Sequence, residues 1–231
     1  MILKPYTQLP QEFLNPEIKK YYDILSKKRA ALVFKRVMDI FFSFLLTLFL
    51  FLPMLIIALC IKIDSKGPVL YKQERVTTYG KKFRIYKFRS MTVGADKVGA
   101  LVTSQNDARI TRTGKFLRKF RLDELPQVFN VLFGDMSIVG TRPEVQKYVD
   151  RYSPQMYATL LMPAGITSLA SIKYKDEDSI IGEISDPAMI DDVYVNDILP
   201  DKMKYNLEYI ENFGFFSDIK LMFETVKQVF L

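Results

Sequence analysis

The sequence predicts a mostly helical α+β protein: an N-terminal re-entrant membrane helical hairpin, then a small cytoplasmic α/β domain with interfacial amphipathic helices. Three observations lead to this prediction. Residues 40–61 form 22 positions without a charge, enough to cross a hydrocarbon core of about 30 Å. Residues 69–73 and 81–91 alternate apolar and polar side chains, as strands do. Most of the remaining apolar residues recur at helical spacing.

The apolar segment 40–61 has lysines and arginines on both sides. Flanks rich in Lys and Arg prefer the cytoplasmic side, so a single crossing should show a clear asymmetry between its flanks. Pro53 lies just past the middle, where it removes a backbone donor and favours a kink or break. We therefore expect a re-entrant hairpin that bends at Leu52-Pro53, with both ends on the cytoplasmic face. An ordinary kinked span is the alternative.

The segments on either side of these elements have simpler interpretations. Residues 14–36 are expected to form a surface helix, with Tyr21, Tyr22 and Leu25 as membrane-interface anchors. A turn is expected at residues 78–80, and a loop over residues 92–108. Residues from 201 onward predict two helices broken at Gly214, the second either packed in the core or lying on the bilayer.

The composition limits the chemistry that this chain can perform. The sequence contains no histidine and a single cysteine, Cys60. Serine–histidine and cysteine–histidine catalysis and histidine-ligated zinc are therefore excluded. The formal charge is +7, and residues 62–121 hold 16 Lys/Arg against 4 Asp/Glu, a local net of +12. Such a basic block beside an apolar segment indicates an anionic partner: lipid headgroups, nucleotide phosphates or nucleic acid.

Two adjacent carboxylates, Asp123 and Glu124, come just before an expected helix start at Pro126 and follow a run of cations. Nearby positive charges should lower the pKa of a carboxylate in this setting. One carboxylate could then attack phosphorus while the other binds a cation or takes a proton. Arginines suit the phosphate oxygens, and Mg²⁺ prefers such oxygen ligands. The simpler alternative is ordinary helix-start chemistry. Prolines 143 and 154 also predict helix starts, the first beside Arg142.

Four segments carry a resemblance to a known family. They are KFRSM (87–91), LDELPQ (122–127), FNVLFGDMSIVGTRPE (129–144) and PAGIT (163–167). They resemble the bacterial sugar transferases, the polyprenyl-phosphate hexose-1-phosphate transferases that are also called monotopic phosphoglycosyl transferases. The resemblance runs from about residue 35 to the C-terminus. The chain looks like the compact form of the family, and the family also has a re-entrant membrane helix.

The resemblance implies a reaction and its residues. Asp123 would attack the sugar-linked phosphate of a UDP-sugar and release UMP, and undecaprenyl phosphate would then take the phosphosugar. Glu124 would act as a base or, with Asp123, as a Mg²⁺ ligand. The product would initiate exopolysaccharide, capsule or glycoconjugate assembly. The residues matched to substrate and phosphate binding are Lys87, Arg89, Arg112, Arg118, Arg142 and, in a late Asp-x-Tyr element, Asp192 and Tyr194.

Two departures from the family pattern affect these expectations. Many members have a Ser-Pro break in the hairpin, whereas Leu52 precedes Pro53 here. The family's usual GITG-(Trp/Leu)-AQ-x-NGR segment is GITSLASIKYKDE (165–177) here, with Ser168, Ser171 and Lys173 in place of a Gly, the Gln and the Asn. Because that region is expected to face the sugar or nucleotide, the identity of the donor sugar is left open.

The sequence thus predicts three parts: an interfacial helix over residues 1–36, the membrane hairpin over 37–62, and a cytoplasmic catalytic domain over 63–231. The expected location is the bacterial inner membrane, with the catalytic domain on its cytoplasmic face. No nucleic-acid partner is expected, and homodimerisation is left open. The competing hypotheses are a membrane-anchored basic scaffold that binds anionic lipid or nucleic acid, and a glycosyltransferase that moves the bare sugar and releases UDP.

Overall fold

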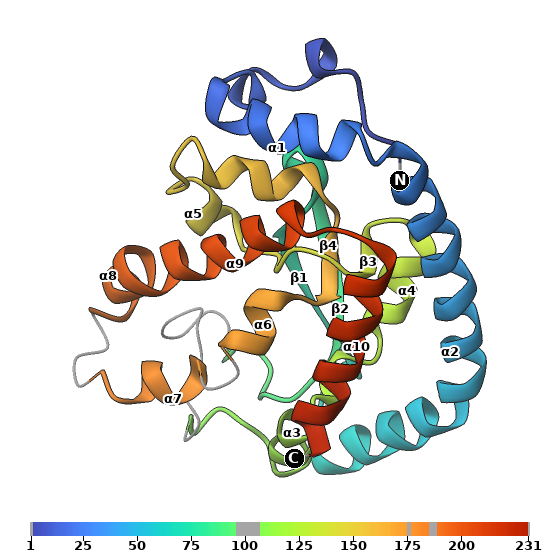
Figure 1. Ribbon diagram of the computed structural model, residues 1–231. Helices are drawn as coiled ribbons and strands as arrows, with labels where there is room; N and C mark the ends of the chain where they lie inside the picture. The colour runs from blue at the N-terminus through green and yellow to red at the C-terminus, as the bar shows by residue number, and fades with distance from the viewer. Residues whose placement is uncertain (1, 96–106, 175–176, 185–188, 231) are drawn as a thin grey trace.

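Helices surround two small sheets in the computed structural model of this chain, which describes residues 2–95, 107–174, 177–184 and 189–230 (Figure 1). One long helix, α2 (Arg29–Asp64), follows one side of the molecule, and α10 (Phe215–Phe230) lies across the front of it in the same view. The strands lie between these two helices and the remaining ones. The mostly helical α+β class predicted from the sequence is confirmed.

Helix α2 is 36 residues long and runs through Pro53 without interruption. The expected division into two separate helices is therefore not seen. Figure 1 shows instead that α2 curves, so that its C-terminal part turns beneath the molecule toward α3 (Arg112–Lys119). Proline removes a helix hydrogen bond and bends a helix without ending it when neighbouring structure holds both halves. By length and composition, α2 is the one helix among the described residues that could cross a membrane.

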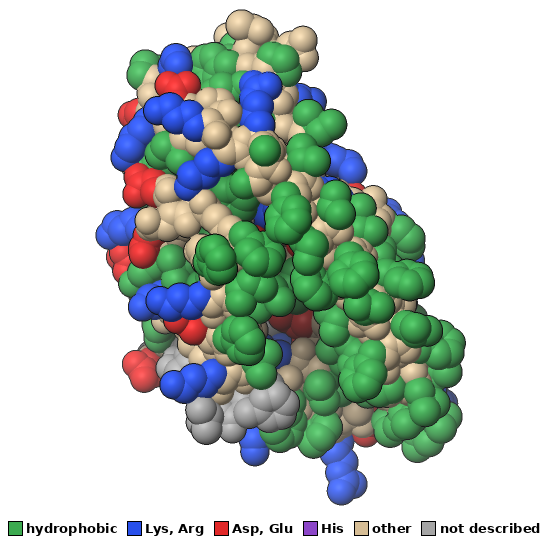
Figure 2. Space-filling model, turned by 45° about the vertical axis from the view of Figure 1, so that its right-hand side comes forward, with side chains coloured by type: hydrophobic (Ala, Val, Ile, Leu, Met, Phe, Trp, Pro, Cys, Tyr) green, Lys and Arg blue, Asp and Glu red, His purple; other side chains and the backbone are tan. Residues whose placement is uncertain are grey.

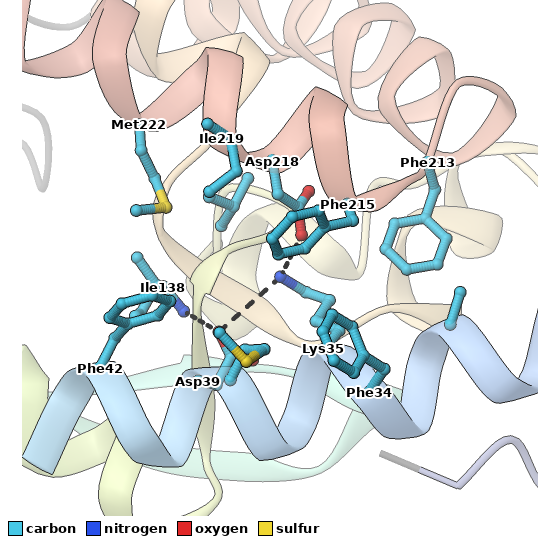
Figure 3. Close-up of a pocket in the computed structure, with 13 residues that line it drawn as sticks. Phe34, Lys35, Asp39, Phe42, Ile138, Phe213, Phe215, Asp218, Ile219 and Met222 are labelled. Carbon is cyan, nitrogen blue, oxygen red and sulfur yellow. Dashed lines mark hydrogen bonds and ion pairs between the residues drawn. The ribbon is translucent and has the colours of Figure 1, made fainter.

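The N-terminal half of α2 is bound to the rest of the molecule by buried charges (Figure 3). Lys35 Nζ lies 2.7 Å from an Asp218 carboxylate oxygen of α10 and 3.8 Å from Asp39. Asp39 accepts hydrogen bonds from the Ser137 hydroxyl, at 2.7 Å, and from the Ile138 N–H, at 3.1 Å. Buried ions are tolerated only when they are paired and hydrogen-bonded, so this network fixes α2 against α10 and the strand that contains Ser137 and Ile138.

The C-terminal end of α2 is bound to the same body. Asp64 accepts the backbone N–H of Thr113 at 2.9 Å, which satisfies an N–H in the first turn of α3. Apolar side chains close the joint between α2, α3 and the second strand. This cluster consists of Met54, Ile61, Phe88 and Leu117. Both ends of α2 therefore contact one globular domain.

The first sheet is an antiparallel hairpin of β1 (Leu70–Val76) and β2 (Lys82–Phe88), joined by the predicted turn at Thr78–Gly80. Asn130, fully buried on α4 (Gln127–Phe133), fixes this hairpin to the helix layer. Its side chain donates to the Arg84 carbonyl at 2.8 Å and accepts the Tyr86 N–H at 2.9 Å. The result is a fixed position for β2 relative to the segment that precedes α4.

The second sheet pairs β3 (Met136–Val139) with β4 (Ala164–Thr167) in parallel. The two strands approach closely where Gly140 follows β3 and Gly165 lies within β4. A Cβ on Gly165 would lie 2.2 Å from the Gly140 nitrogen, so a larger residue at either position would push the strands apart. The chain then leaves β3 in an extended path toward α5 (Gln146–Val149).

The main core lies between α1 (Pro16–Ser26), α9 (Leu199–Glu211) and the 3-10 helix Met156–Leu161. Tyr21, Tyr22 and Leu25 are buried in it, so their expected role as interface anchors is wrong. The single helix expected over residues 14–36 is two helices, α1 and the start of α2. The other short elements are η1 (Tyr6–Gln8), η2 (Gln11–Phe13), α6 (Leu169–Lys173), α7 (Glu177–Gly182), α8 (Ile190–Val193) and a π-helical turn at Tyr194–Ile198.

The predicted break at Gly214 is confirmed, because α9 and α10 lie on either side of it. Helix α10 has two distinct faces. Leu221 and Asp218 are buried, whereas Phe216 and Phe223 are 86% and 73% exposed. Figure 2 shows hydrophobic side chains gathered along the face of the molecule to which α2 and α10 contribute. The core-packed interpretation is confirmed for the buried face, and the bilayer interpretation stays a prediction for the exposed apolar face.

Two local expectations have different outcomes. Most of the loop expected over residues 92–108 lies outside the described residues, which resume at Asp107. Of the helix starts expected at three prolines, the one at Pro126 is confirmed and the other two are corrected. Pro126 caps α4, Pro154 precedes a 3-10 helix, and Pro143 begins no helix, because α5 starts only at Gln146.

Candidate active site

The carboxylates Asp123 and Glu124 lie in a short 3-10 helix, η5 (Leu122–Glu124), between α3 and α4. Arg121, just before it, has a left-handed backbone, with φ of 52°. A non-glycine residue in this conformation costs about 1–2 kcal/mol, and such strain often occurs at functional sites. The turn at Arg121 changes the direction of the chain between α3 and η5. As a result, the two carboxylates lie beside β2.

Glu124 is held by a lysine of the neighbouring strand. Lys87 Nζ on β2 lies 2.7 Å from Glu124 Oε1, and both side chains are partly buried. Burial opposes ionisation of Glu124. The charges of Lys87 and Arg121, the Lys87 hydrogen bond and the charge of Arg142 outweigh that effect and lower its pKa to about 2. Glu124 is therefore ionised at neutral pH.

Asp123 has the opposite shift. Burial raises its pKa above the ordinary value of 3.8, and the adjacent Glu124 charge adds to the increase, while Lys87 and Arg118 oppose it. The sequence predicted that the neighbouring positive charges lower the pKa of a carboxylate in this setting. For Asp123 this expectation is wrong, because burial, which a sequence of cations does not reveal, exceeds the effect of the positive charges.

Arg142 approaches the pair from the extended segment after β3, not from a helix start. Its backbone N–H donates to Asn206 Oδ1 at 3.1 Å, and its Nη1 donates to Ser171 Oγ at 3.0 Å. Its positive charge acts on Glu124, as that of Arg118 acts on Asp123. Of the residues matched to the family, Lys87 thus contacts Glu124, and Arg118 and Arg142 act on the two carboxylates through their charges.

Arg89 and Arg112 have other surroundings. The Arg89 guanidinium is buried and donates to the carbonyls of Ser65, at 2.7 Å, and Lys66, at 3.0 Å, where it satisfies the C-terminal end of α2. Arg112 is exposed at the start of α3, and its charge acts on Asp64. Both residues belong to the joint between α2 and α3. Sequence reasoning could not separate a phosphate-binding arginine from one that caps a helix.

The two residues of the late Asp-x-Tyr element have different surroundings. Asp192 is exposed on α8, whereas Tyr194 is 1% exposed. The Tyr194 hydroxyl accepts a hydrogen bond from Lys202 Nζ at 2.5 Å, and its ring lies 4.4 Å, centroid to centroid, from that of Tyr148. The structure therefore places Tyr194 in the core and Asp192 on the surface.

A metal at this site would have to share its ligands with substrate. Among the residues that the structure describes, no group of three or more Asp, Glu, His or Cys side chains could hold a metal ion. Mg²⁺ in phosphate-transfer sites is commonly bound by one or two carboxylates together with substrate phosphates. Asp123 and Glu124 supply hard oxygen atoms of this kind, so the donor set fits Mg²⁺ bound jointly by protein and diphosphate.

A cavity between α2 and α10 does not contain the carboxylate pair. Its volume is about 40 Å³, and Lys35, Asp39 and Asp218 line it together with Phe34, Phe215 and other apolar side chains (Figure 3). That volume holds only a few water molecules. The cavity is therefore part of the joint between two helices and is too small for a nucleotide sugar.

Sequence reasoning missed several residues around Arg142. Ser171 was considered only as a departure from a family pattern, and neither Lys202 nor Asn206 was singled out. A signal was available in α9, where Lys202 and Asn206 interrupt an apolar face that includes Met203 and Ile210. Polar residues on a core-facing stripe are usually there to bond something specific.

Comparisons with known proteins give a consistent result. The sequence model of the family described as "Bacterial sugar transferase" matches residues 30–231. The chain is 38% identical over 200 residues to a UDP-N-acetylgalactosamine-undecaprenyl-phosphate N-acetylgalactosaminephosphotransferase of Aeromonas hydrophila, covering 84% of this chain and 43% of the relative. It is 36% identical over 204 residues to a UDP-glucose:undecaprenyl-phosphate glucose-1-phosphate transferase of Klebsiella pneumoniae, covering 87% and 41%.

A third relative is closer to this chain in length. It is named a putative undecaprenyl-phosphate N-acetylgalactosaminyl 1-phosphate transferase, from Bacillus subtilis, and is 46% identical over 148 residues, which cover 63% of this chain and 81% of the relative. The chain thus spans less than half the length of the first two relatives. The matched region includes the carboxylate pair, Lys87, Arg118 and Arg142.

Proposed function

Because this chain belongs to the bacterial sugar transferase family, we propose that it transfers a sugar-1-phosphate from a UDP-sugar to undecaprenyl phosphate and releases UMP. The observation that carries this proposal is the Asp123-Glu124 pair, with Lys87 2.7 Å from Glu124 and the charges of Arg118 and Arg142 acting on the two carboxylates. Two relatives are named as UDP-sugar-dependent enzymes that act on undecaprenyl phosphate. The product would initiate polysaccharide or glycoconjugate assembly.

The first step is attack by Asp123 on the donor. A carboxylate oxygen of Asp123 forms a bond to the sugar-linked phosphorus, the bond from that phosphorus to the bridging oxygen breaks, and UMP leaves with the electron pair. The aspartyl phosphosugar results. Burial of Asp123 raises its pKa, which keeps the carboxylate basic enough to be a competent nucleophile once it is ionised.

The second step returns the enzyme to its starting state. An oxygen of undecaprenyl phosphate attacks the same phosphorus, and the bond from phosphorus to Asp123 breaks, which regenerates the carboxylate and gives the polyprenyl-diphosphate sugar. Arg118 and Arg142 would hold the phosphate oxygens, because a guanidinium binds them through two parallel hydrogen bonds. These positions also neutralise charge that develops as UMP leaves.

Glu124 supports the reaction as an anion. Its pKa of about 2 makes it a poor proton acceptor at neutral pH, which favours a role as a Mg²⁺ ligand over a role as a base. When bound by Glu124 and Asp123, Mg²⁺ would neutralise diphosphate charge and polarise the bridging oxygen. Lys87 orients the Glu124 carboxylate through its hydrogen bond.

The inner membrane is the proposed location, with the catalytic domain on the cytoplasmic face, where nucleotide sugars are soluble. The attachment of both ends of α2 to one domain supports a re-entrant course, because a helix that crossed the bilayer once would place its ends on opposite sides. Single cysteines at Thr7 and Lys115, in a Cys60→Ala background, precede and follow α2 and are exposed. Both cysteines should react with a membrane-impermeant thiol probe only when the probe has access to the cytoplasmic side of the membrane. Labelling from opposite sides would refute the re-entrant course.

The reaction is tested with radiolabelled UDP-sugars and undecaprenyl phosphate in detergent. UDP-glucose, UDP-galactose and UDP-N-acetylgalactosamine form the panel. We expect lipid-linked product and UMP from one of them, and a fall of roughly 10³-fold or more for Asp123→Asn. Asp135→Asn, an aspartate of a different ion pair, is the control. UDP in place of UMP would indicate transfer of the bare sugar, and full activity of Asp123→Asn would exclude this nucleophile.

A further inference from the structure

Two polar side chains of α9, Lys202 and Asn206, are completely buried, with 0% of either exposed. The reaction steps above use neither of them. They lie four residues apart, so they occupy one face of the helix. Burying such groups costs several kcal/mol unless each one is bonded, which means that their contacts must be specific. Those contacts lead to the segment Arg142–Pro143–Glu144.

Asn206 holds the backbone of Arg142. Its Oδ1 accepts the Arg142 N–H at 3.1 Å. This part of the chain is extended, between β3 and α5, so that N–H has no helical carbonyl to bond. The amide of Asn206 therefore takes the place of a secondary-structure partner.

The next two residues are held in the same way. Arg75 of β1 donates to the Pro143 carbonyl at 3.2 Å. Lys202 Nζ lies 3.1 Å from Glu144 Oε1, and Arg75 lies 3.7 Å from the other carboxylate oxygen of Glu144. Lys202 also donates to the Tyr194 hydroxyl. Every residue of the segment thus has a partner on α9 or β1.

The Arg142 side chain continues this arrangement toward the carboxylates. Its Nη1 is held by Ser171 Oγ, which is itself hydrogen-bonded to Ser168 Oγ at 2.8 Å. The positive charge of Arg142 acts on Glu124. The backbone and the guanidinium of Arg142 are therefore fixed from different elements, α9 and α6.

We propose that Lys202 and Asn206 are positioning residues, which fix the 142–144 segment so that the Arg142 guanidinium meets the phosphates of the bound nucleotide sugar. This inference rests on the proposed function only in assigning Arg142 to phosphate. Two parallel hydrogen bonds from a guanidinium demand a particular angle and distance, and a misplacement of about 1 Å can cost roughly a hundredfold in rate. The buried contacts of α9 supply that placement before substrate arrives.

The first measurement asks whether α9 holds the segment, and it needs no substrate. Hydrogen exchange of peptides that cover residues 141–145 is compared among wild type, Asn206→Leu and Asn206→Asp. We expect faster exchange in Asn206→Leu and near wild-type exchange in Asn206→Asp, because aspartate keeps the acceptor oxygen. Leu207→Ala, a buried apolar change on the same helix, is the control for general loosening. Unchanged exchange in Asn206→Leu would overturn the proposal.

The second measurement asks whether the contacts made by α9 affect the reaction through Arg142. In the Asn206→Leu variant, kcat/KM for the donor should fall roughly 10- to 100-fold, with most of the change in KM. In an Arg142→Ala background the same change should have almost no further effect, because coupled residues are not additive. Lys202→Met should behave alike, and Asn206→Leu decides the question if that variant does not fold. Equal losses in both backgrounds would overturn the proposal. Absence of UMP release by wild type would refute the proposed function instead and leave the exchange result standing.

Discussion

At the scale of single residues, Asp123 and Glu124 show how two neighbouring carboxylates acquire different chemistry. Glu124 faces Lys87, and its pKa falls to about 2. Asp123 is dominated by burial, and its pKa rises. Environments that shift two acids in opposite directions divide the work between them. One stays an anion that binds cations, and the other keeps the basicity that a nucleophile needs.

The raised pKa of Asp123 predicts an acid limit for the reaction. Asp123 must be ionised to attack, so kcat/KM should fall as the pH drops through its folded-state pKa, which lies above 3.8. Lys87 lowers that pKa, so Lys87→Met should move the acid limb to higher pH. A pH–rate profile of UMP release measures the shift. Lys81→Met, which changes a lysine at the other end of β2, should leave the limb in place. If the acid limb of the pH–rate profile does not move in Lys87→Met, the assignment of that limb to Asp123 is contradicted.

The sequence predicted which motif residues lie together better than it predicted their surroundings, and the catalytic roles of these residues stay predictions. The carboxylate pair, Lys87 and Arg142 stand together as the motifs suggested. Arg89 shows the limit, because a guanidinium can bind carbonyls as well as phosphates, and only the fold brings the end of α2 to it. Asn206 shows another limit of sequence reasoning, because its hydrogen-bond partner Arg142 lies 64 residues earlier in the chain. Neither relation has a local sequence pattern.

The two roles considered for Arg89 make different predictions. Its hydrogen bonds to the end of α2 should make Arg89→Lys less stable by about 2–3 kcal/mol, since a charged hydrogen bond is lost and a buried carbonyl is left without a partner. The KM for the donor should change little. Thermal unfolding in detergent and steady-state kinetics distinguish the roles. A tenfold rise in KM at an unchanged unfolding temperature would restore the phosphate-binding role.

At the scale of elements, α2 is the largest departure from what periodicity could predict. An apolar run, a central proline and balanced flanks indicated a bent membrane segment, and α2 contains all three. The expected division at Leu52-Pro53 is absent, because a proline removes one hydrogen bond and does not by itself end a helix. What holds the curve is tertiary: the Lys35 network at one end and the Arg89 and Thr113 contacts at the other.

The Lys35–Asp218 ion pair predicts a strong dependence of stability on both partners. Lys35→Met should destabilise the protein by about 3–5 kcal/mol, because it leaves a buried carboxylate without its cation. The double variant Lys35→Met/Asp218→Asn should lose much less, since the neutral amide keeps a partner for Tyr209. Thermal unfolding in detergent measures both. Lys19→Met, in an exposed pair with Asp23, is the control and should leave the unfolding temperature almost unchanged.

The same pair predicts the direction of a pH effect. Burial raises the pKa of Asp218 in the folded state, and removal of Lys35 should raise it further. A carboxyl with a raised folded pKa contributes stability at pH values below its unfolded pKa, and that stability is lost as the pH rises through the folded pKa. Lys35→Met should therefore be closest to wild type at acidic pH. A deficit that grows on acidification would contradict the role of the pair.

At the scale of the whole molecule, apolar side chains are exposed along one face, whereas the opposite elements pack into the core. Exposed apolar side chains continue from α2 to α10, with Phe41, Phe44, Phe216 and Phe223 among them (Figure 2). An apolar surface of this extent on a protein marks an interaction site. The predicted break at Gly214 and the helical spacing after it were sufficient to find α10. They could not show which of its faces would meet the core.

This face predicts how the protein behaves when membranes are washed. Contacts between apolar side chains and lipid are not screened by salt, in contrast to the attraction of exposed lysines to headgroups. The protein should therefore stay in the membrane fraction through about 1 M NaCl and alkaline carbonate, and detergent should release it. Immunoblotting of the fractions measures this, with an expressed α2-deleted chain for comparison. Release by salt alone would favour a surface-bound protein.

The ion pair at Lys35 also constrains the order of events during biosynthesis. Lys35 and Asp218 are 183 residues apart, so a ribosome synthesises most of the chain before α10 can supply the carboxylate. Until then the ammonium group of Lys35 has only Asp39 beside it, and the start of α2 lacks its final anchor. We therefore expect α2 to gain its contact with α10 as a late step, after residue 218 has been synthesised. In nascent chains truncated before α10, the start of α2 should lack its contact with Asp218. Completion of α10 should form that contact and fix α2 in place.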